Sequence, residues 1–181
     1  MIAFSQYLRN FLLVITVSAA GYLPAQMAYT PRWSSYVGGD FNFDKVSAVA
    51  ADSVTNCYLG GFLGDGYINN DDGVASPLSY GYDAFAARVS ANGTLEWYTL
   101  FGDTPNGETR GIALGTNQSV IAAGMLSESE VTLGTKAFAA SLAATNGAVG
   151  WIQSIGEYNG TNGFNAVATD ALGNIFAVGY T

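Results

Sequence analysis

The sequence predicts an all-β protein made of repeated antiparallel units with four strands each. An aromatic strand that ends in glycine occurs three times, as WSSYVGG, WYTLFGD and WIQSIGE, beginning at Trp33, Trp97 and Trp151. In each copy one glycine follows the Trp by five residues and a second by 27 or 28. Short apolar runs are bounded by Gly, Asn, Asp and Ser, and no segment keeps a helical period. Because one such unit cannot bury its own apolar face, the repetition predicts stacked units.

The predicted repeats occupy residues 26–181 and follow one another in chain order. A first strand begins at Trp33, complete units cover about 45–102 and 109–156, and a partial unit covers 163–181. Nine recurring Trp and Gly positions define the repeat, and we expect them to be structural: Trp33, Gly38, Gly61, Trp97, Gly102, Gly124, Trp151, Gly156 and Gly179.

Turn residues support antiparallel pairing of neighbouring strands. The Asn92-Gly93 and Asn146-Gly147 pairs supply the positive φ angles that tight hairpins need. In the second unit the expected strands are 109–115, 119–125, 136–143 and 148–155. Four antiparallel strands repeated at about 55 to 65 residues are typical of a β-propeller blade. The expected order is a strand D that carries the Trp, then strands A, B and C, then the next D.

The N-terminus has the layout of a secretory signal peptide over residues 1–25. A segment whose only charge is Arg9 precedes the apolar run FLLVITVSAA, and small residues allow cleavage after Ala20 or Ala25. This run is shorter than the roughly 18 to 20 residues of a spanning helix. We therefore predict a secreted or cell-surface protein with no membrane span after cleavage; an uncleaved anchor is the alternative.

Composition limits the partners of the mature protein. Fourteen acidic residues face six basic ones, and the sequence has no histidine. Phosphate binding needs clustered Lys and Arg, so the sequence disfavours nucleic acid as a partner. For an exported protein we expect an extracellular protein or a glycan as the partner. Cys57 is the single cysteine, which excludes an internal disulfide. It aligns with Ile175 of the last unit, so we expect it to be buried in a strand.

One connection is ten residues longer than its counterpart. Gly61 to Asp83 spans 22 residues, whereas Gly124 to Lys136 spans 12. Insertions in repeat proteins map to loops on one face, so residues 64–82 form a candidate functional loop.

The candidate ligands of this loop are carboxylates, an amide and tyrosines. Oxygen ligands suit calcium, although the distal glutamate of a standard calcium loop is missing. The alternative is that Asp, Asn and Gly form ordinary turns there. The proposed calcium ligands are Asp65, Asn69, Asp71 and Asp72. Tyr67, Tyr80 and Tyr82 are candidates to stack on a sugar, or else to pack against the edges of the blades.

Ten of the fourteen acids are expected on the blade face that holds the D-to-A and B-to-C connections. They are Asp40, Asp44, Asp65, Asp71, Asp72, Asp103, Glu108, Glu128, Glu130 and Glu157. Clustered carboxylates focus negative potential and would attract calcium or a basic partner. The alternative is solvation alone, because these loops are also the longer ones. The opposite turns hold only Asp52 and Asp170.

Two segments resemble the SBBP family of secreted bacterial β-propeller repeats, namely Ser79–Gly102 and Asp170–Thr181. The family's strand of Asp, Ala, Phe, small, Ala and basic residue matches residues 83–88, and its turn and following strand match 173–174 and 178–181. The middle unit departs from the pattern at Lys136, at Ser141 and at 117–119. The resemblance implies a propeller fold and export, but it brings no catalytic residues.

The segment AATNGAVGW, which ends at Trp151, is also similar to the tryptophan-docking repeat of quinoprotein dehydrogenase propellers. That repeat usually carries Asp and Thr-Gly where Ala143 and Asn146-Gly147 stand here. The likeness implies a shared hairpin, in which a Trp covers the blade interface and a glycine makes the turn.

A propeller ring needs roughly four to eight blades, and about two and a half are recognisable here. We expect the remaining blades in the same longer chain or in another copy. The leading functional hypothesis is an exported, non-catalytic binding or structural scaffold that requires no cofactor. The alternative is part of an enzyme propeller, quinone-dependent or carbohydrate-cleaving, with its site residues elsewhere.

Overall fold

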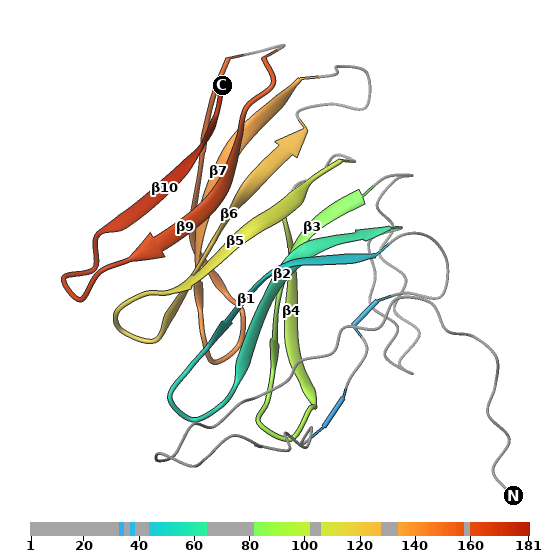
Figure 1. The fold of residues 1–181 in the computed structure, drawn as a ribbon, viewed down its shortest axis with the longest axis vertical. Coiled ribbons are helices and arrows are strands. Elements are labelled where there is room, and N and C mark those ends of the chain that lie inside the picture. The colour runs from blue at the N-terminus through green and yellow to red at the C-terminus, as the bar shows by residue number, and fades with distance from the viewer. Residues whose placement is uncertain are drawn as a thin grey trace, which may run out of the picture.

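The computed structural model describes residues 33–34, 37–38, 44–64, 82–101, 106–127, 134–157 and 160–181. These residues form ten strands and no helix, in three antiparallel sheets (Figure 1). The all-β prediction is therefore confirmed. The predicted signal peptide, residues 1–25, lies outside the described residues, among which no helix has the length and apolarity to span a bilayer.

Strands follow chain order within each sheet. The first sheet contains β1 (Lys45–Ala51), β2 (Cys57–Gly64), β3 (Tyr82–Val89) and β4 (Leu95–Phe101). The second contains β5 (Glu108–Leu114), β6 (Ser119–Ser127), β7 (Thr135–Ala143) and β8 (Val149–Ile155). The third contains β9 (Gly163–Thr169) and β10 (Ile175–Tyr180). The strands predicted for the second unit agree with β5–β8 to within two residues at each end.

Hairpin turns use the predicted glycines. Gly93 has a φ of 88° between β3 and β4, and Gly147 has a φ of 72° between β7 and β8. The asparagine that precedes each glycine does not take a positive φ. The glycine alone therefore supplies the left-handed residue that each turn needs.

The same backbone contact explains why the second conserved position of each repeat unit is a glycine in all three copies. A Cβ added at Gly61, Gly124 or Gly179 would lie 1.8 to 1.9 Å from a carbonyl oxygen of the neighbouring strand. Each glycine faces the place where that strand has one extra residue, so the register shifts. A β-bulge brings the two backbones this close only where no side chain intervenes.

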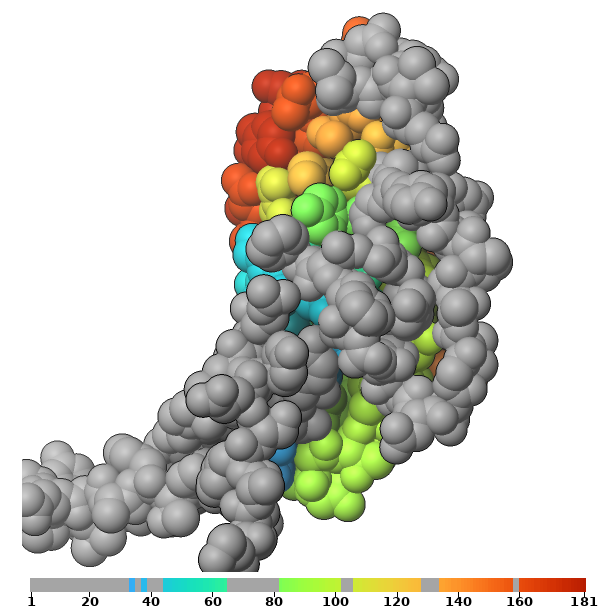
Figure 2. Space-filling view, turned by 90° about the vertical axis from the view of Figure 1, so that its right-hand side faces the viewer, coloured from blue at the N-terminus to red at the C-terminus, as the bar shows by residue number. Residues whose placement is uncertain are grey.

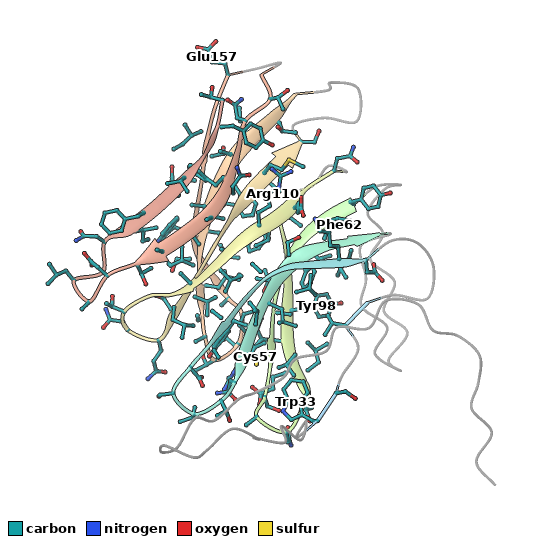
Figure 3. All side chains as sticks on the ribbon, in the orientation of Figure 1. Trp33, Cys57, Phe62, Tyr98, Arg110 and Glu157 are labelled. Carbon is teal, nitrogen blue, oxygen red and sulfur yellow. The ribbon has the colours of Figure 1, made fainter. Side chains whose placement is uncertain are left out.

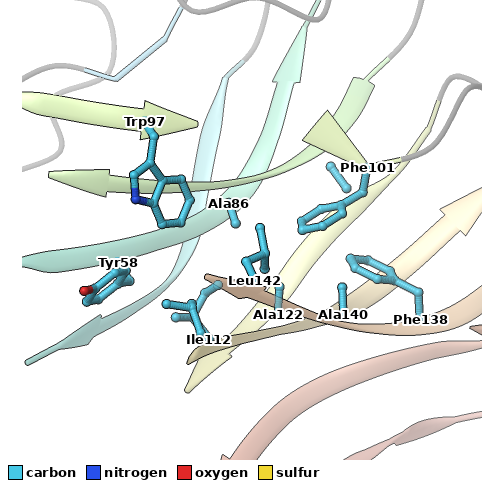
Figure 4. Packing of buried hydrophobic residues seen from close by; sticks show 11 residues of the cluster. Tyr58, Ala86, Trp97, Phe101, Ile112, Ala122, Phe138, Ala140 and Leu142 are labelled. Atoms are coloured by element: carbon cyan, nitrogen blue, oxygen red, sulfur yellow. The ribbon is translucent and has the colours of Figure 1, made fainter. Parts of the chain in front are cut away.

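Apolar side chains fill the space between the first and second sheets. Phe101 and Phe138 meet there with ring centroids 5.2 Å apart. Small residues on the facing strands let the sheets approach closely. The labelled members of this cluster, drawn in Figure 4, are Tyr58, Ala86, Trp97, Phe101, Ile112, Ala122, Phe138, Ala140 and Leu142. These two sheets therefore stack face to face.

The opposite face of the first sheet carries a second apolar cluster. Leu59, Leu63 and Phe85 are fully buried there, and Trp33 and Val37 pack with them. Cys57 is buried in the same cluster, as its alignment with Ile175 predicted. Four residues of the predicted first strand are described, and they lie outside the strands.

The first strands of the three sheets, β1, β5 and β9, are neighbours. In Figure 1, β9, β5 and β1 lie in a row, and β5 contacts both of the others. In Figure 2 the same order appears on the surface, from the cyan and green of the first sheet to the red of the third at the upper left. The sheets therefore follow one another in space as they do in the chain.

Candidate functional site

Most of the predicted calcium and sugar site lies outside the described residues, namely Asp65, Tyr67, Asn69, Asp71, Asp72 and Tyr80. Tyr82 is described, and its ring meets that of Phe62 edge-on with centroids 4.8 Å apart. Sugar stacking at Tyr82 stays a prediction, since the residue is 38% exposed beside this contact. Among the described residues, no three side chains of His, Cys, Asp or Glu are grouped to hold a metal ion.

The predicted acidic face is described at three positions, Asp44, Glu108 and Glu157. Its other members lie outside the described residues: Asp40, Asp65, Asp71, Asp72, Asp103, Glu128 and Glu130. Asp44 accepts a hydrogen bond of 3.0 Å from the backbone N–H of Gly64. Glu108 begins β5 and is buried, so it belongs to a sheet and not to an exposed loop.

The buried carboxylate of Glu108 is the centre of a polar network between the first two sheets. Its Oε1 accepts hydrogen bonds from Lys45 Nζ at 2.8 Å and from Ser47 Oγ at 2.6 Å. Its Oε2 accepts a bond of 2.8 Å from Arg110 Nε. One carboxylate thus joins β1 to β5.

Arg110 extends the network to the third sheet. Its Nη1 donates to the Tyr180 hydroxyl at 2.9 Å and to Asn165 Oδ1 at 3.4 Å. Its guanidinium carbon also lies 5.7 Å from the centre of the Tyr180 ring. Figure 3 shows Arg110 on β5, toward the end of the sheets opposite to Trp33. We call Lys45, Ser47, Glu108, Arg110, Asn165 and Tyr180 the inner network.

The β-bulges bring these side chains together. Ser47, Arg110 and Asn165 are the extra residues of the bulges in β1, β5 and β9. They occupy the same repeat position, so stacking the sheets places them next to one another. A bulge re-aims side chains that a regular strand would turn to the other face. The network is therefore a consequence of the repeat.

The network keeps Glu108 ionised. Burial raises the pKa of this carboxyl, but the hydrogen bonds from Lys45, Ser47 and Arg110 outweigh burial and hold the pKa at about 2. Burial lowers the pKa of Arg110, and its bonds to Glu108 and Tyr180 more than reverse that effect. A general acid or base works best with a pKa near the working pH. Glu108 is therefore suited to holding sheets together and poorly suited to proton transfer.

A groove of about 540 Å³ opens at the other end of the first two sheets, where Asp52, Tyr58 and Arg88 line it. Arg88 Nη1 lies 3.0 Å from Glu96 Oε2 and donates to the carbonyl oxygen of Ala144 at 3.3 Å. Its guanidinium carbon lies 5.9 Å from the centre of the Tyr58 ring. Arg88 therefore links the two sheets as well as lining the groove.

The two acids predicted for this end, Asp52 and Asp170, build turns. Asp52 Oδ1 accepts backbone N–H bonds from Val54 at 3.0 Å and Asn56 at 2.9 Å. Asp170 Oδ1 accepts the equivalent bonds two and four residues on, both at 2.9 Å. Each aspartate also takes a 2.7 Å bond from the amide of an asparagine four residues later. These carboxylates are occupied by their own hairpins.

Two of the three repeat tryptophans, Trp33 and Trp97, are anchored on hairpin turns of a neighbouring unit. Trp97 of the first sheet donates from Nε1 to Ala144 O at 3.0 Å, in the β7–β8 turn of the second. A Cβ at Gly147 of that turn would lie 2.6 Å from the Trp97 ring. Trp33 covers Gly93 of the first sheet in the same way, since a Cβ added at Gly93 would lie 3.1 Å from the Trp33 ring. The glycine of the turn makes room for the indole.

The sequence did not reveal the inner network. Its only visible trace is the pair Glu108 and Arg110, two residues apart on an inner strand. A second unforeseen feature is Asp83, which is buried and whose Oδ2 has no hydrogen-bond partner among the described residues. Burial raises the pKa of this carboxyl. No protein-family model matches the chain, and the search of characterised proteins gave no match.

Proposed function

We propose that these sheets are consecutive blades of a β-propeller that serves as a non-catalytic binding or structural scaffold in an exported protein. The observation that carries the proposal is the docking of Trp97 on the Gly147 turn of the next sheet. Trp33 and Gly93 repeat the arrangement one unit earlier. A contact that recurs between successive units fits blades placed at a constant angle around an axis.

The inner strands agree with this arrangement. In a propeller the first strand of every blade faces the central channel, so β1, β5 and β9 would be the channel strands. They are neighbours, and their equivalent bulges supply Ser47, Arg110 and Asn165 to one network. Stacked sheets alone do not require equivalent residues of different units to meet. The inner network therefore supports an arrangement of the sheets around a central axis.

The proposed role is scaffolding because four charged groups hold sheets or turns together. Glu108 and Arg110 hold neighbouring sheets, while Asp52 and Asp170 hold turns. The resemblance to the SBBP repeats supports the same role, since the residues shared with that family fill strands and turns. Export rests on the layout of residues 1–25. Any ligand would bind in loops such as residues 64–82.

The docking of Trp97 is tested by comparing it with the equivalent Trp151. Trp97 is 8% exposed and Trp151 is 38% exposed. We expect Trp97→Ala to lower the free energy of unfolding by about 3 kcal/mol. Trp151→Ala should cost less than about 1 kcal/mol, since it deletes fewer buried contacts. Urea denaturation of both variants measures the difference, and equal losses would contradict the proposed stacking.

Export is tested separately by expressing the full chain in a host with a secretory pathway. We expect the product outside the cytoplasm to begin at residue 21 or 26, after cleavage at one of the predicted sites. N-terminal sequencing by mass spectrometry identifies the first residue. A chain that retains Met1 and stays in the cytoplasm would contradict the export part of the proposal.

A further inference from the structure

The groove at one end of the first two sheets is bounded by three hairpin turns. The β1–β2 turn supplies Asp52 and Val54, the β5–β6 turn supplies Gln118, and the β7–β8 turn supplies Thr145. Arg88 of β3 also lines the groove, and every lining residue belongs to the first two sheets or their turns. Its volume of about 540 Å³ falls within the range of small-molecule sites. The groove is therefore large enough for a small ligand.

Tyr58 and Arg88 distinguish this place from the same place in the second sheet. They are paired across β2 and β3, and Arg88 also pairs with the repeat Trp of β4. At the equivalent positions of the second sheet, Ile121 is paired with Ser141, which pairs with the repeat Trp of β8. That sheet therefore forms without a cation or a phenol at this place. The repeat alone does not account for the two polar side chains of the groove.

Arg88 keeps N–H groups that a ligand can use. Its Nη1 lies 3.0 Å from Glu96 Oε2 and donates to Ala144 O at 3.3 Å. A guanidinium has five N–H donors, and within the described residues the hydrogen bonds of Arg88 come from Nη1. Its Nε is buried without a partner there, while the side chain as a whole is 19% exposed. A ligand oxygen against the guanidinium would therefore meet N–H donors that no protein oxygen occupies.

The charges around the groove favour a neutral ligand. Arg88 is already paired with Glu96, and the Asp52 carboxylate lines the groove, so an anion would meet two negative groups. Asp52 itself accepts four hydrogen bonds, two on each oxygen, all from its own hairpin. A carboxylate has about four acceptor positions, so Asp52 has none left for a metal ion or an ammonium group.

The rest of the lining combines hydrogen-bonding groups with apolar side chains. Gln118 adds an exposed amide and Thr145 an exposed hydroxyl, whereas Val54 and Leu114 add apolar surface. A sugar has hydroxyl groups that both donate and accept hydrogen bonds, and its C–H groups form an apolar face. A few polar groups on a partly apolar wall are typical of a site for such a molecule.

We propose that this groove binds a neutral mono- or disaccharide. One sugar hydroxyl accepts a hydrogen bond from the Arg88 guanidinium, and another bonds to the Gln118 amide. The inference rests on the proposed function, because it names the ligand class of the binding scaffold. None of the lining residues belongs to residues 65–82, which contain the tyrosines that the sequence predicts for sugar stacking.

The test titrates the full chain with neutral sugars and with charged relatives of the same sugars. The probes are glucose, galactose, mannose, maltose and lactose, together with the uronate and the 2-amino derivative of each monosaccharide. NMR follows the Arg88 Nε–H and the Gln118 side-chain amide. We expect at least one neutral sugar to shift both signals with a Kd of about 1 mM or less. Charged relatives should bind at least about tenfold more weakly, since their charge meets no free partner.

Gln118 and Asn117 provide a matched pair of variants. Their φ angles are 57° and 55°, so glycine fits either position without strain. Both side chains are exposed, and Gln118 lines the groove whereas Asn117 does not. We expect Gln118→Gly to weaken sugar binding about tenfold through the lost hydrogen bond, and Asn117→Gly to leave it unchanged. Similar melting temperatures of the two variants would show that both are folded.

Three results would overturn the proposal: no binding of any neutral sugar, tighter binding of a charged relative, or equal losses of affinity in the two glycine variants. If no sugar binds while Trp97→Ala still costs much more stability than Trp151→Ala, the stacked scaffold stands and only the saccharide site is lost.

Discussion

The boundary between the first two sheets and the boundary between the second and third are built from the same repeat but, within the described strands, differ in completeness. At the first, Phe138 and Leu142 of β7 pack against Phe101 and Trp97 of β4. At the second, β9 and β10 provide the inner half of the contact, and Trp151 and Ile155 stay exposed. The inner network spans both boundaries. The inner strands therefore align the sheets, whereas the outer hairpin buries the apolar side chains.

The largest expected effect comes from filling the space at a repeat glycine. A Cβ at Gly124 would lie 1.9 Å from the carbonyl oxygen of Glu108. We expect Gly124→Ala to cost more than about 4 kcal/mol or to prevent folding, because backbone must move to admit the methyl group. Gly150→Ala is the control, since its Cβ would meet nothing closer than 3.6 Å. Thermal melting by circular dichroism measures both, and similar melting temperatures would contradict the bulge explanation.

The apolar contact of the complete boundary gives the next effect. Phe138 is fully buried between the first two sheets, whereas Phe176 on β10 is mostly exposed. We expect Phe138→Ala to cost about 3 to 4 kcal/mol and Phe176→Ala less than about 1 kcal/mol. Urea denaturation distinguishes them. If Phe176→Ala were as costly, the two boundaries would not differ in the way that the exposures indicate.

Charge at the inner network gives an intermediate, pH-dependent effect. The pKa of Glu108 is about 2 in the folded chain against an ordinary 4.5. The carboxylate therefore stabilises the fold above pH 4.5, and that contribution is lost as the pH falls toward 2. We expect Glu108→Gln to cost about 2 kcal/mol at pH 7 and to reduce the fall in stability between pH 4.5 and 2.

The control for that experiment is Glu96→Gln. Glu96 pairs with Arg88 at the opposite end, and its side chain is partly exposed. An exposed ion pair contributes little, so this variant should lose less than about 1 kcal/mol at neutral pH. Stability curves from urea denaturation at several pH values compare the two. An unchanged acid profile in Glu108→Gln would show that Glu108 does not carry the inner network.

The smallest effect concerns one hydrogen bond across the complete boundary. Thr99 Oγ1 donates to the carbonyl oxygen of Gly147 at 2.7 Å. Its counterpart on β8 is Gln153, which is exposed. We expect Thr99→Val to cost about 1 kcal/mol and Gln153→Ala less than about 0.5 kcal/mol. Denaturation in urea again measures the difference, and the reverse order would place the stronger polar contact at the second boundary.

Local patterns in the sequence predicted the strands and their turns. The alternation of apolar residues and the glycines at positions 93 and 147 depend only on neighbours in the chain, so β5–β8 and the hairpins could be placed. The burial of Cys57 followed from its alignment with Ile175 in another copy of the repeat. In a repeat protein the same position can be compared between copies, which is why these predictions succeeded.

The inner network could not be predicted because it depends on bulges. Ser47 and Arg110 are the extra residues of bulges at Gly61 and Gly124, and the sequence shows these glycines but not the bulges that they allow. Glu108 was assigned to an acidic loop because the expected strand began at residue 109, whereas β5 begins at Glu108. A sequence pattern shows which residues alternate within one strand. It does not show that equivalent residues of different strands come into contact, because that contact depends on how the sheets stack.

The most direct test of the stacking is the hydrogen-exchange rate of the tryptophan indole N–H groups, read by NMR in the full chain. We expect slow exchange at Trp97, whose Nε1–H is bonded to Ala144 O of the next sheet at 3.0 Å, and fast exchange at Trp151. Equal rates at the two positions would contradict the claim that a Trp of one sheet is seated on the hairpin of the next.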